Sequence, residues 1–200
     1  VVHSEMFPLL RADEPNPLEL FQIWLNLPAA GKMAAPHFTM FWSEDIPQYV
    51  VTDTHGCVTE ITCIAGHLPG ARDITLLPPP PHSWAADATA DVAIWTIKMA
   101  PNARWQLPAA ANPASRRNLY FFKGAHVTVG GQAISEHAAL ELRATQAVEL
   151  VNGNETAEFL LLQGRPINEP VVQYGPFVMN SQQEIEQAFD MHAVDIYGLS

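Results

Sequence analysis

The feature that most constrains the fold is a dense series of short, β-rich segments in the second half of the chain. Gly and Asn turn signals separate the segments, and both residues tolerate the positive φ angles of hairpin turns. No helical pattern comes between them, which excludes a parallel α/β sheet and leaves a sandwich, a jelly roll or a barrel. The segments expected to form strands are residues 92–99, 118–122, 126–129, 140–143, 147–150 and 157–163.

Two further strands and one helix are predicted elsewhere. Residues 21–27 alternate apolar and polar side chains before Pro28, as a half-buried strand does, and residues 57–64 are rich in β-branched residues. Residues 31–48 show no clear period and are predicted to be an ordered loop. Ser181 and Glu184 have capping-box spacing ahead of an apolar stripe, which predicts a helix. We expect this helix to pack across the outside of a barrel or against the other half of the protein.

Composition limits the location and the partners of the protein. The 200 residues include 21 acidic and 10 basic side chains, for a net charge of -11, which does not suit direct binding to nucleic acid. No apolar run approaches the roughly 20 residues of a membrane helix, so no membrane partner is expected. Cys57 and Cys63 are separated by roughly 20 Å of predicted strand, too far for a disulfide. Free thiols fit a reducing cytoplasm, which is the expected location.

One pair of side chains has the spacing of metal ligands. His3 and Glu5 alternate with Val2, Ser4 and Met6, so on a strand the imidazole and the carboxylate share one face. Such a pair can bind a cation, although on spacing alone a surface ion pair is the commoner explanation. No nucleophile elbow and no phosphate-binding glycine loop is present. The other histidines show no ligand spacing: His37, His55, His67, His82, His126, His137 and His192.

Three segments resemble the pirin family. Residues 164–180, Gly-Arg-Pro-Ile-Asn-Glu-Pro-Val-Val-Gln-Tyr-Gly-Pro-Phe-Val-Met-Asn, are similar to its C-terminal signature. Residues 1–6 resemble the His-Ser-Glu strand at the end of its N-terminal metal site, and residues 20–28 resemble the strand that follows. The resemblance implies an all-β bicupin of jelly-roll (double-stranded β-helix) barrels with one C-terminal helix. It divides the chain into the truncated end of a metal-binding cupin (1–28), a crossover with connecting strands (29–90) and a C-terminal cupin with the helix (91–200).

The resemblance also implies a metal site of which this chain holds half. In the family, a His-x-His pair on an earlier strand and the histidine and glutamate of His-Ser-Glu hold the metal. On that match His3 and Glu5 are the third and fourth ligands of a divalent cation such as Fe(II), and the first two would lie upstream of Val1. In the second barrel the ligand region reads Trp105-Gln106-Leu107, none of which is a useful ligand for a transition metal. That barrel is therefore expected to hold no metal and to be filled by apolar side chains from residues 92–99 and 119–122.

Two functions from different classes follow from the resemblance. One is a quercetin 2,3-dioxygenase-like enzyme, in which Glu5 acts as the base for the hydroxyl of a small aromatic, flavonol-like substrate. The other is a non-enzymatic, metal-dependent module that binds protein partners as a transcriptional co-regulator. The acidic charge fits a protein partner better than DNA, but it does not separate the two. A site with open coordination positions favours the enzyme, and the fragment alone is expected to be inactive.

Overall fold

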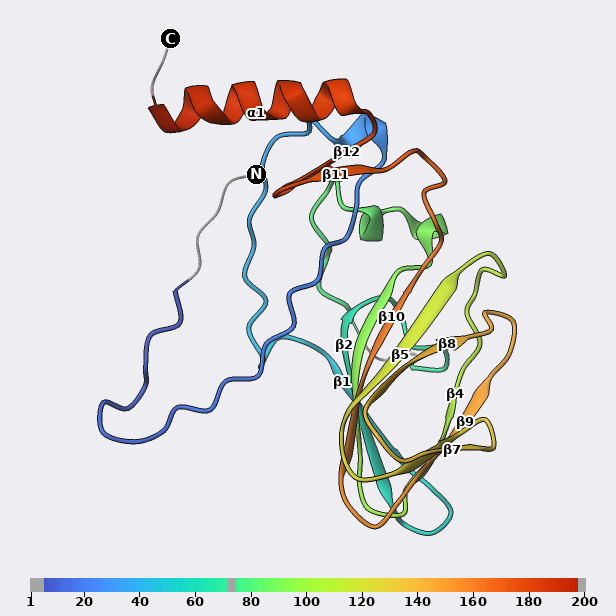
Figure 1. The fold of residues 1–200 in the computed structure, drawn as a ribbon. Coiled ribbons are helices and arrows are strands. Elements are labelled where there is room, and N and C mark those ends of the chain that lie inside the picture. The colour runs from blue at the N-terminus through green and yellow to red at the C-terminus, as the bar shows by residue number, and fades with distance from the viewer. Residues whose placement is uncertain (1–5, 72–74, 198–200) are drawn as a thin grey trace.

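The structure, a computed structural model, describes residues 6–71 and 75–197, and of residues 191–197 it describes only the helical backbone. Two antiparallel sheets face each other (Figure 1). The six-stranded sheet runs in the order β1 (Gln48–Thr52), β2 (Val58–Ala65), β3 (Ala93–Met99), β10 (Ala157–Gly164), β5 (Arg116–Lys123) and β8 (Ala138–Leu142). The four-stranded sheet runs in the order β4 (Arg104–Leu107), β9 (Val148–Asn152), β6 (Val127–Val129) and β7 (Gln132–Ile134).

The core fills the space between the two sheets. In β3 every second side chain is buried, because alternate residues of a strand point to opposite faces of the sheet. The rings of Phe121 and Phe159, on paired positions of β5 and β10, lie 5.4 Å apart in this core. Trp95, Ile97, Met99, Leu119 and Phe121 are all buried in it. This confirms the prediction that apolar side chains of residues 92–99 and 119–122 fill the barrel.

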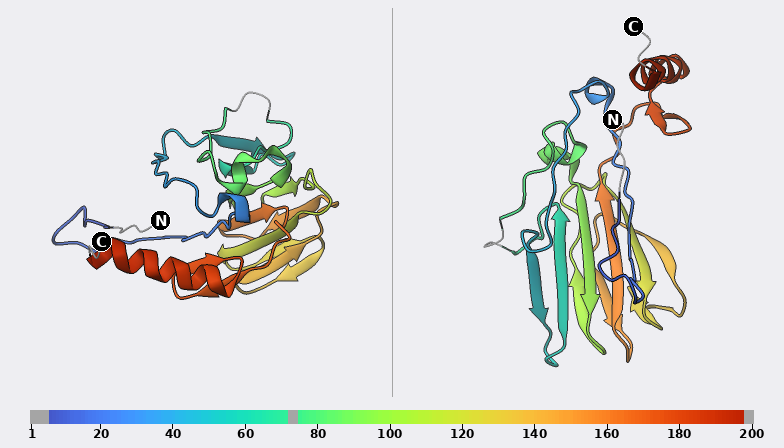
Figure 2. Two further views of the ribbon diagram at one scale, coloured as in Figure 1. Left: turned by 90° about the horizontal axis from the view of Figure 1, so that it is seen from above. Right: turned by 90° about the vertical axis from the view of Figure 1, so that its left-hand side faces the viewer.

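A long extended segment crosses the outer face of the six-stranded sheet. We call residues 18–32 the crossing segment; in the right panel of Figure 2 the blue N-terminal chain passes in front of β10 and β5. The prediction of a strand over residues 21–27 is wrong, because the structure assigns no strand there. A strand needs a neighbour to pair its backbone groups, and no described strand of this chain is hydrogen-bonded to residues 21–27, which lie over the face of the sheet. The crossing segment ends in a short 3-10 turn, η1 (Ala29–Gly31).

The C-terminal residues form an arm that stands away from the sandwich. The arm consists of the hairpin β11 (Val172–Tyr174) and β12 (Phe177–Met179), followed by α1 (Gln182–Tyr197). Figures 1 and 2 show α1 beyond the end of the two sheets, on its own hairpin. The expected packing across the outside of the barrel is therefore wrong, because α1 packs on β11 and β12 and the Phe189 ring contacts Phe177 at 4.8 Å. The alternative, packing against the other half of the protein, stays a prediction. Among the described helices, none has the length and apolar character needed to cross a membrane.

Two 3-10 turns, η2 (Trp84–Ala86) and η3 (Ala88–Ala90), lead from the connecting region into β3. A cluster of contacts ties these turns to the start of the arm. The Trp84 indole Nε1 donates to the Arg165 carbonyl at 2.8 Å, and the Arg165 guanidinium lies 5.0 Å from the centre of the Trp84 ring. Arg165 also donates to the Thr89 carbonyl at 3.0 Å. These contacts fix the point at which the chain leaves β10 for the arm.

Candidate functional site

The predicted metal ligands His3 and Glu5 lie outside the described residues. Their donor chemistry, an imidazole nitrogen and a carboxylate oxygen, suits a divalent transition metal. Within residues 6–71 and 75–190, whose side chains the structure describes, no group of three or more His, Cys, Asp or Glu side chains is arranged to hold a metal ion. The metal site and its ligand pair therefore stay predictions.

The C-terminal barrel has apolar side chains where related barrels would have ligands. β4 directs Trp105 and Leu107 into the core and leaves Gln106 exposed. Leu107 has no donor atom, and the Trp105 indole offers only an N–H donor. The residues of this region therefore do not fit a metal. That the barrel binds no metal in solution stays a prediction.

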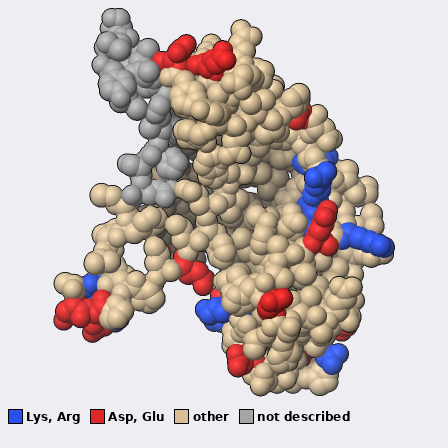
Figure 3. Space-filling view, in the orientation of Figure 1, with Lys and Arg blue, Asp and Glu red and all other residues tan. Residues whose placement is uncertain are grey.

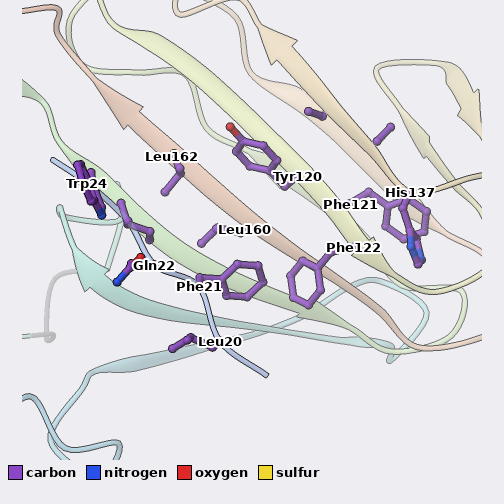
Figure 4. A pocket seen from close by; sticks show the side chains of 13 residues that line it. Leu20, Phe21, Gln22, Trp24, Tyr120, Phe121, Phe122, His137, Leu160 and Leu162 are labelled. Atoms are coloured by element: carbon purple, nitrogen blue, oxygen red, sulfur yellow. The ribbon is translucent and has the colours of Figure 1, made fainter. Parts of the chain in front are cut away.

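A groove with a volume of about 640 Å³ lies between the crossing segment and the outer face of the six-stranded sheet. Its volume is within the range of ordinary small-molecule sites. Figure 4 shows the side chains that line it, which come from the crossing segment, β5, β8, β10 and the residue before β8. The lining residues are Leu20, Phe21, Gln22, Ile23, Trp24, Tyr120, Phe121, Phe122, His137, Ala138, Ala139, Leu160 and Leu162.

The groove is mainly apolar, with aliphatic and aromatic side chains in similar numbers and polar groups at a few points. The rings of Phe21 and Phe122 meet edge to face with centroids 4.8 Å apart. His137 meets the ring of Phe121, which is buried in the core, in the same way at 5.5 Å. The Tyr120 hydroxyl, the Gln22 amide and the His137 imidazole supply the hydrogen-bonding groups. Sequence reasoning missed the groove, and the only signal for it was the alternation of apolar residues from Phe21 onward.

The N-terminal part of the described chain exposes many large apolar side chains. Met6 and Leu10 are 90% and 93% exposed, and Phe38 is 82% exposed. The others are Phe7, Leu9, Leu18, Leu20, Phe21, Ile23, Trp24, Leu25, Met33, Met40 and Trp42. All of these exposed side chains lie within residues 6–42. On the face seen in Figure 3, acidic and basic side chains are scattered, and the basic ones form no stripe.

Comparison with known proteins identifies the family. The Pirin C-terminal cupin domain matches residues 94–193. The chain belongs to the pirin family. This match covers the strands from β3 onward and most of the arm, and the pirin signature of residues 164–180 falls within it.

The relatives of this pirin chain include bacterial and plant proteins. A Pseudomonas aeruginosa protein named "Putative quercetin 2,3-dioxygenase" is 36% identical over an alignment of 201 residues, gaps included. The alignment covers 94% of this chain and 61% of the relative. Pirin-1 of Arabidopsis thaliana is 33% identical over 192 residues, covering 95% of this chain and 60% of the relative. Among solved structures, a quercetin 2,3-dioxygenase from Acinetobacter baumannii is 26% identical, with a TM-score of 0.63, and the match covers 85% of this chain and 54% of that one. The chain thus spans about 60% of the length of these curated relatives.

Proposed function

We propose that this chain is the C-terminal part of a two-cupin, metal-dependent protein that oxidises a flavonol-like substrate with dioxygen. The observation that best supports the proposal is the similarity in sequence and fold to the quercetin 2,3-dioxygenase from Acinetobacter baumannii. The relatives are also longer than this chain, which leaves room for the other half of a metal-binding cupin. In this proposal residues 1–28 end the N-terminal cupin, residues 29–90 connect the barrels, and residues 91–200 form the second cupin.

The proposed roles of the chain's own residues are few. His3 and Glu5 would hold a divalent metal, Fe(II) in our proposal, together with two histidines from outside the chain. A bound metal of this kind supplies Lewis acidity and open positions for substrate and dioxygen. The Glu5 carboxylate would take the proton from the flavonol hydroxyl, since a carboxylate is a suitable general base once it lies within hydrogen-bonding distance. In this proposal the second cupin supplies no metal ligand and has a structural role.

The test is turnover of quercetin under oxygen by the full-length, metal-loaded protein. We expect turnover to be lost in both His3→Ala and Glu5→Ala, and on removal of the metal with a chelator. Ser4→Ala is the matched control, because residue 4 lies on the opposite face of the predicted strand and should leave turnover unchanged. No turnover with any flavonol by protein that carries a full complement of metal would contradict the enzyme proposal.

A second function is compatible with the acidic charge of the chain. In this alternative the full-length pirin is a metal-dependent module that binds a protein partner and acts as a transcriptional co-regulator. The net charge of -11 fits a protein partner better than direct contact with nucleic acid. The quercetin assay separates the two functions. The enzyme turns over quercetin, whereas the module has an occupied metal site and shows no turnover.

A further inference from the structure

A second groove lies at the end of the sandwich where the β4–β5 loop meets the β8–β9 turn, at the right-hand side of Figure 1. The Ala110 N–H donates to the Ala144 carbonyl at 2.8 Å, which joins the loop to the turn. The groove has a volume of about 450 Å³ and is formed by residues 113–116 on one side and residues 141–145 on the other. Both of its walls carry an arginine.

The two arginines, Arg116 and Arg143, are exposed and lie on neighbouring strands. Arg116 begins β5, and Arg143 directly follows the last residue of β8. Because Arg117 pairs with Leu142 in this antiparallel pair, the next position of the register places Arg143 opposite Arg116. Like charges directly opposite each other on neighbouring strands destabilise a sheet. The sheet therefore gains nothing from these two charges, whereas a bound anion would be held by both.

Neither of these guanidinium groups forms an ion pair with a carboxylate of the described residues. Other arginines of the same barrel differ: Arg104 lies 3.8 Å from a Glu149 carboxylate oxygen, and Arg165 lies 3.7 Å from one of Asp87. The chain has 21 acidic side chains, so two neighbouring cations without an ion pair stand out. Their charges are available to a ligand.

The wall that carries Arg116 is fixed by a buried network. The Ser115 hydroxyl donates to the Asp91 carboxylate at 2.6 Å, and the Asn112 N–H donates to the same oxygen at 3.0 Å. Ser115 is only 7% exposed, so the residue before Arg116 is anchored in the core. A fixed backbone reduces the entropy that is lost when a ligand binds.

We propose that this groove binds a small organic phosphate, with its phosphate group between Arg116 and Arg143 and its organic part on Pro113 and Leu142. Guanidinium groups bind oxyanions through paired N–H donors, and two of them suit a phosphate monoester, which carries a charge of about −1.5 to −2 at pH 7. Glu141 also lines the groove, and its carboxylate opposes an anion there. The site does not depend on the function proposed above, because none of its residues belongs to the predicted metal site.

The test measures binding of phenyl phosphate to the full-length protein by isothermal titration calorimetry. Inorganic phosphate lacks the organic part, and benzoate replaces the phosphate group by a carboxylate. The variants are Arg116→Gln, Arg143→Gln and Glu141→Gln. Arg104→Gln is the matched control, because Arg104 is an exposed arginine of the same barrel that already has an ion-pair partner. Thermal unfolding without ligand shows whether each variant folds as the wild type does.

We expect the dissociation constant for phenyl phosphate to rise about tenfold in Arg116→Gln and in Arg143→Gln, the effect of losing a hydrogen bond between charged groups. It should stay unchanged in Arg104→Gln and fall in Glu141→Gln, which removes the opposing carboxylate. No detectable binding to the wild type, or wild-type affinity in both arginine variants, would overturn the site. Tighter binding of benzoate would overturn the choice of phosphate, and equal binding of inorganic phosphate would overturn the role of Pro113 and Leu142.

Discussion

The ring of Phe21 meets the ring of Phe122 edge to face, with centroids 4.8 Å apart and an interplanar angle of 70°. Phe21 belongs to the crossing segment and Phe122 to the outer face of β5, so this contact joins the N-terminal chain to the second cupin. Edge-to-face pairs of this kind contribute about 0.5–1.5 kcal/mol beyond the area they bury. The contact also forms part of the wall of the groove (Figure 4).

Replacing Phe122 by Ala should loosen the crossing segment. Phe122 is half-buried, so we expect a loss in the free energy of unfolding of about 1–2 kcal/mol, less than for a fully buried phenylalanine. Urea denaturation measures this loss. Phe38→Ala is the control, because Phe38 is 82% exposed and should change stability by less than about 0.5 kcal/mol. Equal losses in the two variants would show that the Phe21 contact contributes nothing.

Arg117 is a buried cation whose partners are carbonyl oxygens. Its guanidinium donates to the Pro108 carbonyl at 2.7 Å and to the Gln146 carbonyl at 3.4 Å. Burial lowers the pKa of Arg117, and Asp91 opposes the shift. Arg117→Ala should cost about 2–4 kcal/mol in the free energy of unfolding, because it leaves a cavity and frees two carbonyls.

Two further variants separate volume from charge at this position. Arg117→Met fills most of the space without a buried charge and should cost less than half of the alanine loss. Arg116→Ala removes the exposed neighbour and should have little effect on stability. An Arg117→Met loss as large as that of Arg117→Ala would mean that the hydrogen bonds, not the packing, carry the contribution.

Cys63 should resist ionisation in the folded protein. Burial raises the pKa of its thiol from 9.0 to about 11. The folded state favours the neutral thiol, so this contribution to stability is present below pH 9 and is lost as the pH rises through 11. In Cys57→Ser, thiolate absorbance at 240 nm should appear only near the higher pH and should move to lower pH after unfolding in urea. Cys63→Ser is the matched control, and a titration near 9 in folded Cys57→Ser would contradict the shift.

Gly66 should tolerate no side chain. Its φ is +79°, and a Cβ there would lie 2.1 Å from the Val92 carbonyl oxygen and 2.7 Å from the Ala93 Cα. Gly56 has nearly the same φ, +81°, with nothing within 4 Å of the added atom. We therefore expect Gly56→Ala to cost about 1–2 kcal/mol from backbone strain alone, and Gly66→Ala to cost at least about 3 kcal/mol. Thermal unfolding of both variants gives the difference, and equal losses would argue that the β2–β3 connection shifts to make room.

Local patterns predicted much of the sandwich. The strands expected at residues 92–99, 118–122 and 157–163 match β3 (Ala93–Met99), β5 (Arg116–Lys123) and β10 (Ala157–Gly164) closely. Their alternation follows from burial of one face, and their turns follow from residues within a few positions of each other. β1, β4, β7 and the arm hairpin were missed. β7, β11 and β12 are only three residues long, and β1 has its neighbour on one side only, so the sequence signal for these strands is weak.

Local patterns did not predict which distant segments of the chain come together. Residues 21–27 alternate as a strand does, yet they form none in the described structure, because strand formation depends on a neighbour and not on alternation alone. The groove has the same origin: residues 20–24 and 120–122 are far apart in sequence, and only folding brings their side chains together. His3 and Glu5, by contrast, were proposed from spacing and resemblance, and they lie outside the described residues.

The start of α1 shows where local information ends. Ser181 and Glu184 lie within one helical turn, so the sequence alone determined that the Ser181 hydroxyl would accept the Glu184 N–H. The expected return bond from the Ser181 N–H is replaced by one from Asn180 to Glu184. The contacts of Asn180 with Glu169 and of Glu169 with Ala29 join distant segments and form only when the whole chain folds. A helix cap depends on neighbours along the chain. The hydrogen bond from the Ala29 N–H to the Glu169 carboxylate instead depends on two sheets and a hairpin, which bring residues 140 positions apart to within 2.6 Å.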